Sequence, residues 1–210
     1  MSMKVKICGI TSPEDAATAA QAGADLLGLV FYDQSPRCVD IEAAAEISRS
    51  IPPYVLRVGL FVNAQPQQVA EAITRCGLQK LQFHGDETPE YCGQFGMMTM
   101  KAFRVRGPET LDLLQQYPTD AWLLDAHVKG QFGGTGQTFD WGLAARAVQF
   151  GKPVFLAGGL APGNVAEAVR AVRPYGVDVS GGVESAPGRK DPEKVKAFVK
   201  AAKEAAEAGD

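Results

Sequence analysis

The chain has 210 residues, of which 46% are hydrophobic and 21% are charged, and its formal net charge is −3 at pH 7. This composition is typical of a globular protein with a sizeable core, and the length allows one large domain or two small ones. A slightly acidic chain without a basic block does not favour a nucleic-acid surface, although a few local donors can still bind a small anion. Because no apolar run reaches the length of a membrane span and no signal-type segment opens the sequence, we expect a cytoplasmic protein that does not bind membranes.

Cysteine and histidine usage gives no sign of a metal. The four cysteines, Cys8, Cys38, Cys76 and Cys92, are scattered without the paired spacing of a zinc site, and the two histidines lie far apart. We therefore expect reduced thiols and no metal site.

The dominant pattern along the chain is a short apolar run followed by an amphipathic segment. Strands are predicted at residues 4–8, 25–31, 56–62, 78–83, 99–103, 121–125, 153–157 and 177–180. Helices are predicted at residues 13–22, 41–50, 66–76, 108–116, 141–150, 163–172 and 192–208.

Regular alternation of strand and helix is typical of parallel strands joined by crossover helices. Eight such units predict an α/β fold, a single (β/α)8 TIM barrel that covers residues 1–210. The alternative is an open, doubly wound sheet. The barrel is favoured because no single glycine-rich fingerprint marks a switch point, and candidate site residues follow several strands instead.

A thiol stands at the end of the first predicted strand. Cys8 and Gly9 close this strand, and Ser12 followed by Pro13 starts the next helix. The carboxyl ends of barrel strands are where active sites of this architecture lie, so Cys8 is a candidate for chemistry. A cysteine on a strand more often packs than reacts, and packing stays the alternative.

Two charged residues occupy comparable places. Asp125 follows an apolar run, where partial desolvation favours the neutral, proton-donating form of a carboxyl group; a helix cap or an ion pair is the alternative. Arg37 follows Ser35-Pro36, and its guanidinium can hold a carboxylate through two hydrogen bonds. A lone loop arginine would instead be solvated.

Glycine-rich loops follow the last three strands, at residues 133–136, 158–159 and 181–182. Glycine lets backbone N–H groups approach an anion closely, and the loops after the last two strands of such barrels frequently hold a phosphate. Any one of these loops can be only a turn, but two glycine pairs in the expected loops predict a phosphate site.

Six strings of residues, taken together, resemble motifs of the phosphoribosylanthranilate isomerase family of tryptophan biosynthesis. Residues 6–11, 35–37 and 82–85 are similar to the family's K-x-C-G-[IL]-T, S-P-R and Q-L-H-G. Residues 123–125, 133–136 and 156–160 match its L-L-D, G-G-T-G and L-A-G-G-L without change. The resemblance covers essentially the whole chain.

This resemblance implies an isomerase that converts N-(5-phosphoribosyl)anthranilate into 1-(2-carboxyphenylamino)-1-deoxyribulose 5-phosphate by an Amadori rearrangement, without a cofactor. It implies that Asp125 is the general acid that protonates the ring oxygen and that Cys8 is the general base that removes the C2 proton. Such a pair needs one group protonated and the other deprotonated in one pocket. We therefore expect apolar surroundings to raise the pKa of Asp125, and positive potential from the phosphate loops, or from a nearby Lys6, to lower the pKa of Cys8. The partner is a small phosphorylated sugar substrate, and the implied binding residues are Arg37, His84, Gly134, Gly158, Gly159, Asp178, Gly181 and Gly182.

Three positions depart from the family's pattern. Gly181 stands where D-V-S-S-G-V-E has its second serine, which removes one hydroxyl donor to phosphate. Cys38 stands where an aromatic residue is common, and this affects the packing expected around the anthranilate ring. Phe83 replaces a leucine, which we interpret as a change in core packing.

Other functions stay open at this point. The related sugar isomerase of histidine biosynthesis would require an aspartate in place of Cys8. A sugar-phosphate binding protein without activity is a second alternative, and a thiol redox protein is a third, although it would need a C-x-x-C motif that the chain lacks. The sequence does not decide between a monomer and a homodimer.

Overall fold

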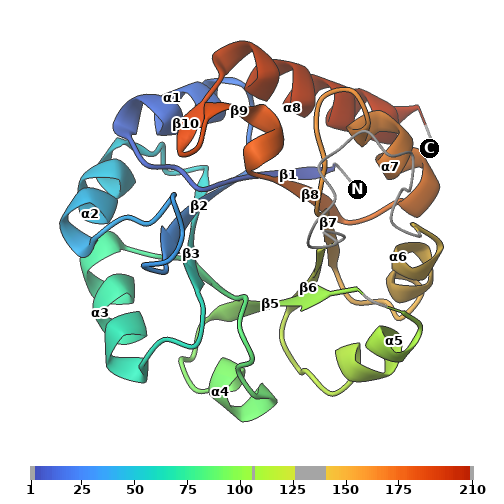
Figure 1. The fold of residues 1–210 in the computed structure, drawn as a ribbon, viewed down its shortest axis with the longest axis horizontal. Coiled ribbons are helices and arrows are strands. Elements are labelled where there is room, and N and C mark those ends of the chain that lie inside the picture. Colours follow the sequence, from blue (N-terminus) through green and yellow to red (C-terminus); the bar gives the residue numbers. More distant parts are fainter. Residues whose placement is uncertain (1–2, 106, 126–140, 209–210) are drawn as a thin grey trace.

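The computed structural model describes residues 3–105, 107–125 and 141–208. Eight strands close into a barrel in which each strand pairs with its neighbours along the chain, and β1 pairs in parallel with β8. Helices surround the barrel on its outside (Figure 1). The predicted (β/α)8 barrel is therefore confirmed, and the open doubly wound sheet is wrong.

The strands of the barrel are β1 Lys4–Cys8, β2 Leu26–Phe31, β3 Leu56–Phe61, β4 Lys80–Phe83, β5 Met98–Arg104, β6 Ala121–Asp125, β7 Val154–Ala157 and β8 Gly176–Val179. The helices are α1 Pro13–Gln21, α2 Ile41–Ser50, α3 Pro66–Cys76, α4 Pro89–Gly93, α5 Glu109–Leu114, α6 Trp141–Val148, α7 Val165–Val172 and α8 Pro192–Glu207. None of these helices is long and apolar enough to cross a membrane.

Elements that the sequence patterns did not predict follow β4 and β8. Helix α4 has 5 residues, too few to show a helical period. After β8 come a 3-10 helix, η1 Gly181–Val183, and a two-stranded hairpin of β9 Glu184–Ala186 and β10 Arg189–Lys190. In Figure 1 this hairpin lies beside α1, close to β1.

Helix starts follow the capping residues that the sequence shows. The side chain of Ser12 accepts a hydrogen bond from the backbone N–H of Asp15, and Pro13 stands in the first turn of α1. Asp40 caps α2 in the same way, by accepting from the N–H of Ala43. These caps fix where the chain leaves the rim of the barrel.

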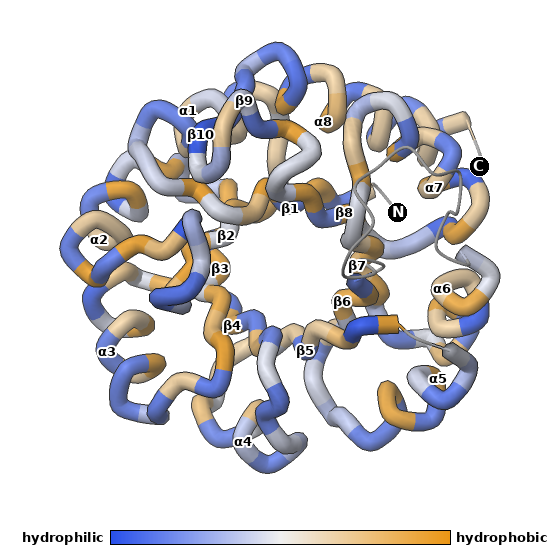
Figure 2. Tube along the Cα trace, viewed as in Figure 1, coloured by the Kyte–Doolittle hydropathy of each residue, from blue (hydrophilic) through white to orange (hydrophobic). Residues whose placement is uncertain are grey.

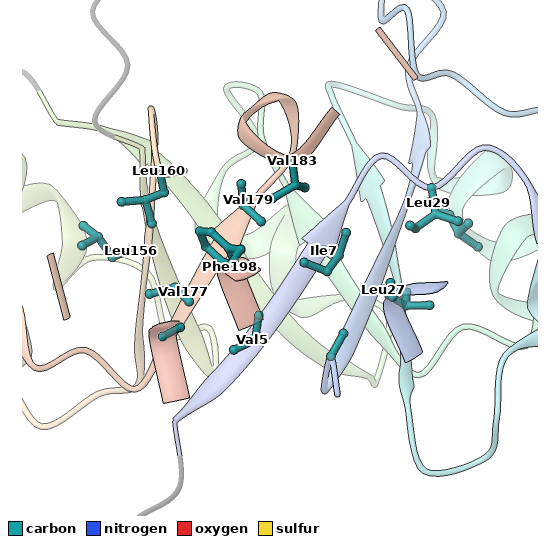
Figure 3. Close-up of a cluster of buried hydrophobic side chains, with 14 of the residues drawn as sticks. Val5, Ile7, Leu27, Leu29, Leu156, Leu160, Val177, Val179, Val183 and Phe198 are labelled. Atoms are coloured by element: carbon teal, nitrogen blue, oxygen red, sulfur yellow. The ribbon is translucent and has the colours of Figure 1, made fainter. Parts of the chain in front are cut away.

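Successive side chains of β1 alternate between the layer under the helices and the interior of the barrel. Val5 and Ile7 point outward into the layer between strands and helices, where they lie near Phe198 of α8 (Figure 3). Because successive residues of a strand point to opposite faces, Lys6 and Cys8 point into the barrel. A smaller apolar cluster fills the interior, formed by Leu26, Val58, Met100, Ala102, Leu123, Phe155 and Ala157.

The outer layer has the polarity expected of helices that cover a sheet. In Figure 2 the helices carry both hydrophobic and hydrophilic segments, as helices with one buried face do. Phe83 lies in this layer, fully buried, with its ring 5.4 Å from that of Tyr91 and 5.6 Å from that of Phe95. The interpretation of Phe83 as a core residue is confirmed.

Candidate active site

The candidate residues gather because all eight parallel strands end at one rim of the barrel. Cys8 is the last residue of β1 and Asp125 the last of β6. Arg37 lies in the loop after β2, and His84 directly follows β4. Asp178 lies near the end of β8, which pairs with β1.

Cys8 is buried beside an internal ion pair. The side chain of Lys6 is fully buried, and its Nζ lies 2.8 Å from Oδ1 of Asp178. A Cβ atom placed on Gly28 would lie 2.8 Å from Sγ of Cys8 and 3.1 Å from Nζ of Lys6, so the thiol and the ammonium group share one small space. A side chain at position 28 would occupy that space.

The electrostatics of Cys8 differ in part from the sequence-based expectation. Burial raises the pKa of the thiol; the positive charge of Lys6 lowers it, the negative charge of Asp178 raises it, and the net shift is upward. We expected a nearby cation, Lys6 included, to lower this pKa. Lys6 does act in that direction, but desolvation is the larger effect.

Lys6 itself stays charged despite its burial. Burial alone would lower its pKa, but the carboxylate of Asp178 and the neighbouring Cys8 raise it, and the net shift is upward. The thiol therefore has a permanent cation beside it.

Gly28 is a site residue that the sequence reasoning missed. It stands in the middle of β2, in the run Leu-Leu-Gly-Leu-Val-Phe, and it pairs with Cys8 in register. A glycine inside an apolar strand often marks a place where another group approaches the backbone closely. This signal was present in the sequence.

Asp125 and His84 are brought together at the rim. Nε2 of His84 lies 3.4 Å from Oδ2 of Asp125. On the other side of the ring, Nε2 of the buried Gln82 lies 3.2 Å from Nδ1. With the amide nitrogen of Gln82 donating to Nδ1, the neutral ring carries its proton on Nε2 and points it at Asp125.

Arg37 is held in an ion pair instead of standing free in solvent. Its Nε and Nη2 atoms lie 2.7 and 2.6 Å from the two carboxylate oxygens of Glu184. Nζ of Lys190 lies 2.7 Å from Oε1 of the same carboxylate. Burial raises the pKa of Glu184, but the hydrogen bonds from Arg37 and Lys190 outweigh it and hold that pKa below its usual range.

The loop that carries Arg37 is a tight turn. Ser35 accepts a hydrogen bond through its Oγ from the N–H of Arg37, 3.1 Å away, and its carbonyl accepts one from the N–H of Cys38. Cys38 is exposed and lines a cavity of ≈ 510 Å³, which also borders Phe31 and Phe61 but neither Cys8 nor Asp125.

The first glycine loop, after β7, has a backbone conformation that favours glycine. Gly158 and Gly159 have φ angles of 84° and 66°, in the left-handed region that favours glycine. Asn164 holds this loop, since its side chain donates to the carbonyl of Gly159 and accepts from the N–H of Ala161. Asn164 was not among the predicted site residues.

In the second glycine loop, after β8, a side chain would not fit at Gly182 but would fit at Gly181. Gly182 lies against the carbonyl oxygen of Leu160, where any side chain would overlap it. A Cβ on Gly181 would lie 3.4 Å from Nη2 of Arg37, which is an ordinary contact. The serine that Gly181 replaces would thus stand beside Arg37. Gly134, with the rest of residues 133–136, lies outside the described residues.

The described part of the chain contains no group of three or more His, Cys, Asp or Glu side chains that could hold a metal ion. It does place a thiol, a carboxyl group and an imidazole at one rim, together with two glycine loops and a guanidinium. Such a set can exchange protons with a bound molecule and hold anionic groups at its ends.

Comparison with known proteins identifies one family over nearly the whole chain. Residues 5–201 match the family model described as N-(5'-phosphoribosyl)anthranilate (PRA) isomerase. An N-(5'-phosphoribosyl)anthranilate isomerase of Trichlorobacter lovleyi is 56% identical over 203 residues, 97% of this chain and 99% of the relative.

Solved structures agree with this match. The phosphoribosyl anthranilate isomerase of Thermotoga maritima is 40% identical and superimposes with a TM-score of 0.87, covering 96% of this chain and 99% of the other. A second isomerase structure, with the same TM-score and coverage and 39% identity, is a complex with reduced 1-(o-carboxyphenylamino)-1-deoxyribulose 5-phosphate. The chain therefore belongs to the N-(5'-phosphoribosyl)anthranilate isomerase family.

Proposed function

We propose that Cys8 is the general base and Asp125 the general acid of this isomerase. The reaction follows from the family: the chain isomerises N-(5'-phosphoribosyl)anthranilate in tryptophan biosynthesis. The assignment of the two residues is supported by one observation above all. The thiol and the carboxyl group stand at the ends of β1 and β6, on one rim, each with an ionisable neighbour that can tune it.

Asp125 starts the reaction by giving its proton to the ring oxygen of the ribose. The bond between C1 and that oxygen breaks, and the lone pair of the anilino nitrogen forms an iminium. Cys8 as thiolate then takes the proton from C2, and the electron pair of the C–H bond forms a C1–C2 double bond that neutralises the iminium. Tautomerisation of this enolamine gives the aminoketose.

The remaining side chains hold the substrate in our proposal. Arg37 binds the anthranilate carboxylate. Gly158, Gly159, Gly181 and Gly182, with Gly134, offer backbone N–H groups to the phosphate.

Two further side chains act near the reacting carbons. Asp178 accepts a hydrogen bond from a ribose hydroxyl through Oδ2, the oxygen that does not face Lys6. His84 faces the leaving ring oxygen from beside Asp125. The geometry that supports these roles is the position of both residues at the rim, next to Cys8 and Asp125 respectively.

A fluorescence assay with freshly made phosphoribosylanthranilate tests the proposal, because the anthranilate signal falls as the substrate is consumed. We expect turnover by the wild type, and its loss in Cys8→Ser and Asp125→Asn with binding of the reduced product analogue retained. Full turnover by either variant would remove that residue from its role. We also propose a cytoplasmic location, which the four free cysteines support.

A further inference from the structure

We infer that Glu184, assisted by Lys190, is a positioning residue that fixes the guanidinium of Arg37 and leaves one of its edges for the substrate's carboxylate. This inference rests on the binding role proposed for Arg37. It concerns residues of the hairpin after β8, which lie outside the strands that carry Cys8 and Asp125.

The first argument is the geometry of the guanidinium. Arginine offers two edges that can each hold a carboxylate with two hydrogen bonds: the side edge, Nε with Nη2, and the end edge, Nη1 with Nη2. Glu184 occupies the side edge, at 2.7 and 2.6 Å. Within residues 3–105, 107–125 and 141–208, no side chain or carbonyl accepts a hydrogen bond from Nη1 of Arg37. The end edge is the one left for a ligand.

The second argument is charge. A single pair of Arg37 and Glu184 would be neutral and would attract an anion weakly. Lys190 adds a second cation to the same carboxylate, 2.7 Å from Oε1, and its side chain is fully buried. Two positive groups and one negative group leave a net charge of +1, in a place where low solvent exposure strengthens electrostatic interactions.

The third argument is the position of Arg37, Glu184 and Lys190 relative to Cys8. Arg37 lies over Gly9, directly after Cys8, so closely that a side chain on Gly9 would overlap it. The hairpin that carries Lys190 is tied to the start of α1, since the N–H of Lys190 donates to Oδ2 of Asp15 at 3.0 Å. Glu184 thus joins the loop after β2 to the loop after β8, across the strand that carries the thiol. Its position sets the distance between the carboxylate site and Cys8.

The test compares two ligands in the full-length protein by calorimetry. One is reduced 1-(2-carboxyphenylamino)-1-deoxyribulose 5-phosphate; the other is reduced 1-phenylamino-1-deoxyribulose 5-phosphate, which lacks the carboxylate. In Glu184→Gln the amide nitrogen faces a guanidinium N–H, so Arg37 loses its orientation. We expect a loss of affinity of about tenfold or more for the carboxylated ligand and a change of less than about twofold for the other. Glu193→Gln, an exposed glutamate in the first turn of α8, is the matched control and should bind both ligands as the wild type does.

A double variant, Glu184→Gln with Lys190→Met, covers the case in which the single variant fails to fold, because it removes the buried cation that would lose its partner. It should show the same ligand-selective loss. Equal losses for both ligands, or no loss, in a folded variant would overturn the inference while leaving Arg37 in its role. A wild type that binds both ligands equally would instead overturn the role of Arg37, and the inference with it.

Discussion

Lys6 and Asp178 form an ion pair inside the barrel, 2.8 Å apart and beside the thiol of Cys8, although 172 positions separate them in the chain. The two charges act on Cys8 in opposite directions. Lys6 lowers the pKa of the thiol and Asp178 raises it, while burial, the largest effect, raises it. The protonation state of Cys8 is therefore set by a balance that single substitutions can disturb in either direction.

The pair predicts pKa shifts of opposite sign. Lys6→Met should raise the pKa of Cys8, because it removes the cation and leaves the negative Asp178 in place; Asp178→Asn should lower it. Thiolate absorbance at 240 nm during a pH titration, with Cys8→Ser subtracted, measures this in the free protein. In the pH dependence of kcat/KM, activity falls at low pH as the thiolate of Cys8 is protonated. This acidic limb should move to higher pH in Lys6→Met.

Lys4→Met is the matched control, since Lys4 lies on the same strand but pairs with Asp25 at the surface. It should leave the titration of Cys8 unchanged. Shifts of the same sign in Lys6→Met and Asp178→Asn would contradict the balance described here.

Cys8 and Asp125 should be needed for turnover and not for binding. Cys8→Ser and Asp125→Asn should each lose roughly two to four orders of magnitude in kcat, the usual scale of a general acid or base. Affinity for the reduced product analogue should stay close to that of the wild type. If Cys8→Ser lowers the melting temperature but keeps its turnover, the thiol is a packing residue.

Gly28→Ala should impair catalysis through the thiol that its methyl group would meet at 2.8 Å. Something must shift to admit this methyl group, and a displacement of about 1 Å in a reacting group can reduce a rate about a hundredfold. We expect kcat to fall by about 10- to 100-fold, with a smaller effect on KM.

Gly93→Ala serves as the comparison for Gly28→Ala, because a Cβ at Gly93 in α4 meets nothing within 4 Å. It should keep wild-type kinetics. Wild-type kcat in a folded Gly28→Ala protein would show that the thiol tolerates displacement, or that the methyl group is accommodated elsewhere.

Gly181→Ser restores the hydroxyl that the family's pattern has at this position. The site has room for it, since the nearest atom to a Cβ is Nη2 of Arg37 at 3.4 Å. A hydrogen bond to a charged group contributes about 1.5–3 kcal/mol, so we expect KM to fall by about tenfold or more with the melting temperature unchanged. Steady-state kinetics at low substrate concentration measure this. An increase in KM would mean that the serine disturbs Arg37 instead of binding phosphate.

The barrel could be predicted from the sequence because each of its strands is an apolar run that stands alone between amphipathic segments. The period of 2 or 3.6 residues is a local signal, and it needs no knowledge of contacts. Helix α4 and the hairpin of β9 and β10 could not be found this way. With 5, 3 and 2 residues they span too few repeats of the helical or strand period to reveal it, although Thr88-Pro89 and Pro187-Gly188 were visible cap and turn signals.

The candidate site could be predicted only as a set of residues at strand ends. The hydrogen bonds and ion pairs between these residues depend on which strands become neighbours and on the rotamers of the side chains. Arg37 and Glu184 are 147 positions apart, and no local pattern joins them. The extent to which Cys8 is buried was also beyond the sequence, and the expected fall in its pKa was therefore wrong in direction: the cation was foreseen and the larger effect of desolvation was not.

The closure of β1 on β8 has a consequence for the order of synthesis. A ribosome adds about 5–20 residues per second, so the 172 positions between Lys6 and Asp178 take about 9–34 s to make. During that interval the strand with the thiol can pair with β2 but has no neighbour on its other side. The lysine beside Cys8 likewise lacks its anion. Until β8 arrives, the thiol of Cys8 therefore lacks one of the two strands that flank it in the finished barrel, and the protonation state that the finished barrel imposes on Cys8 does not exist before then.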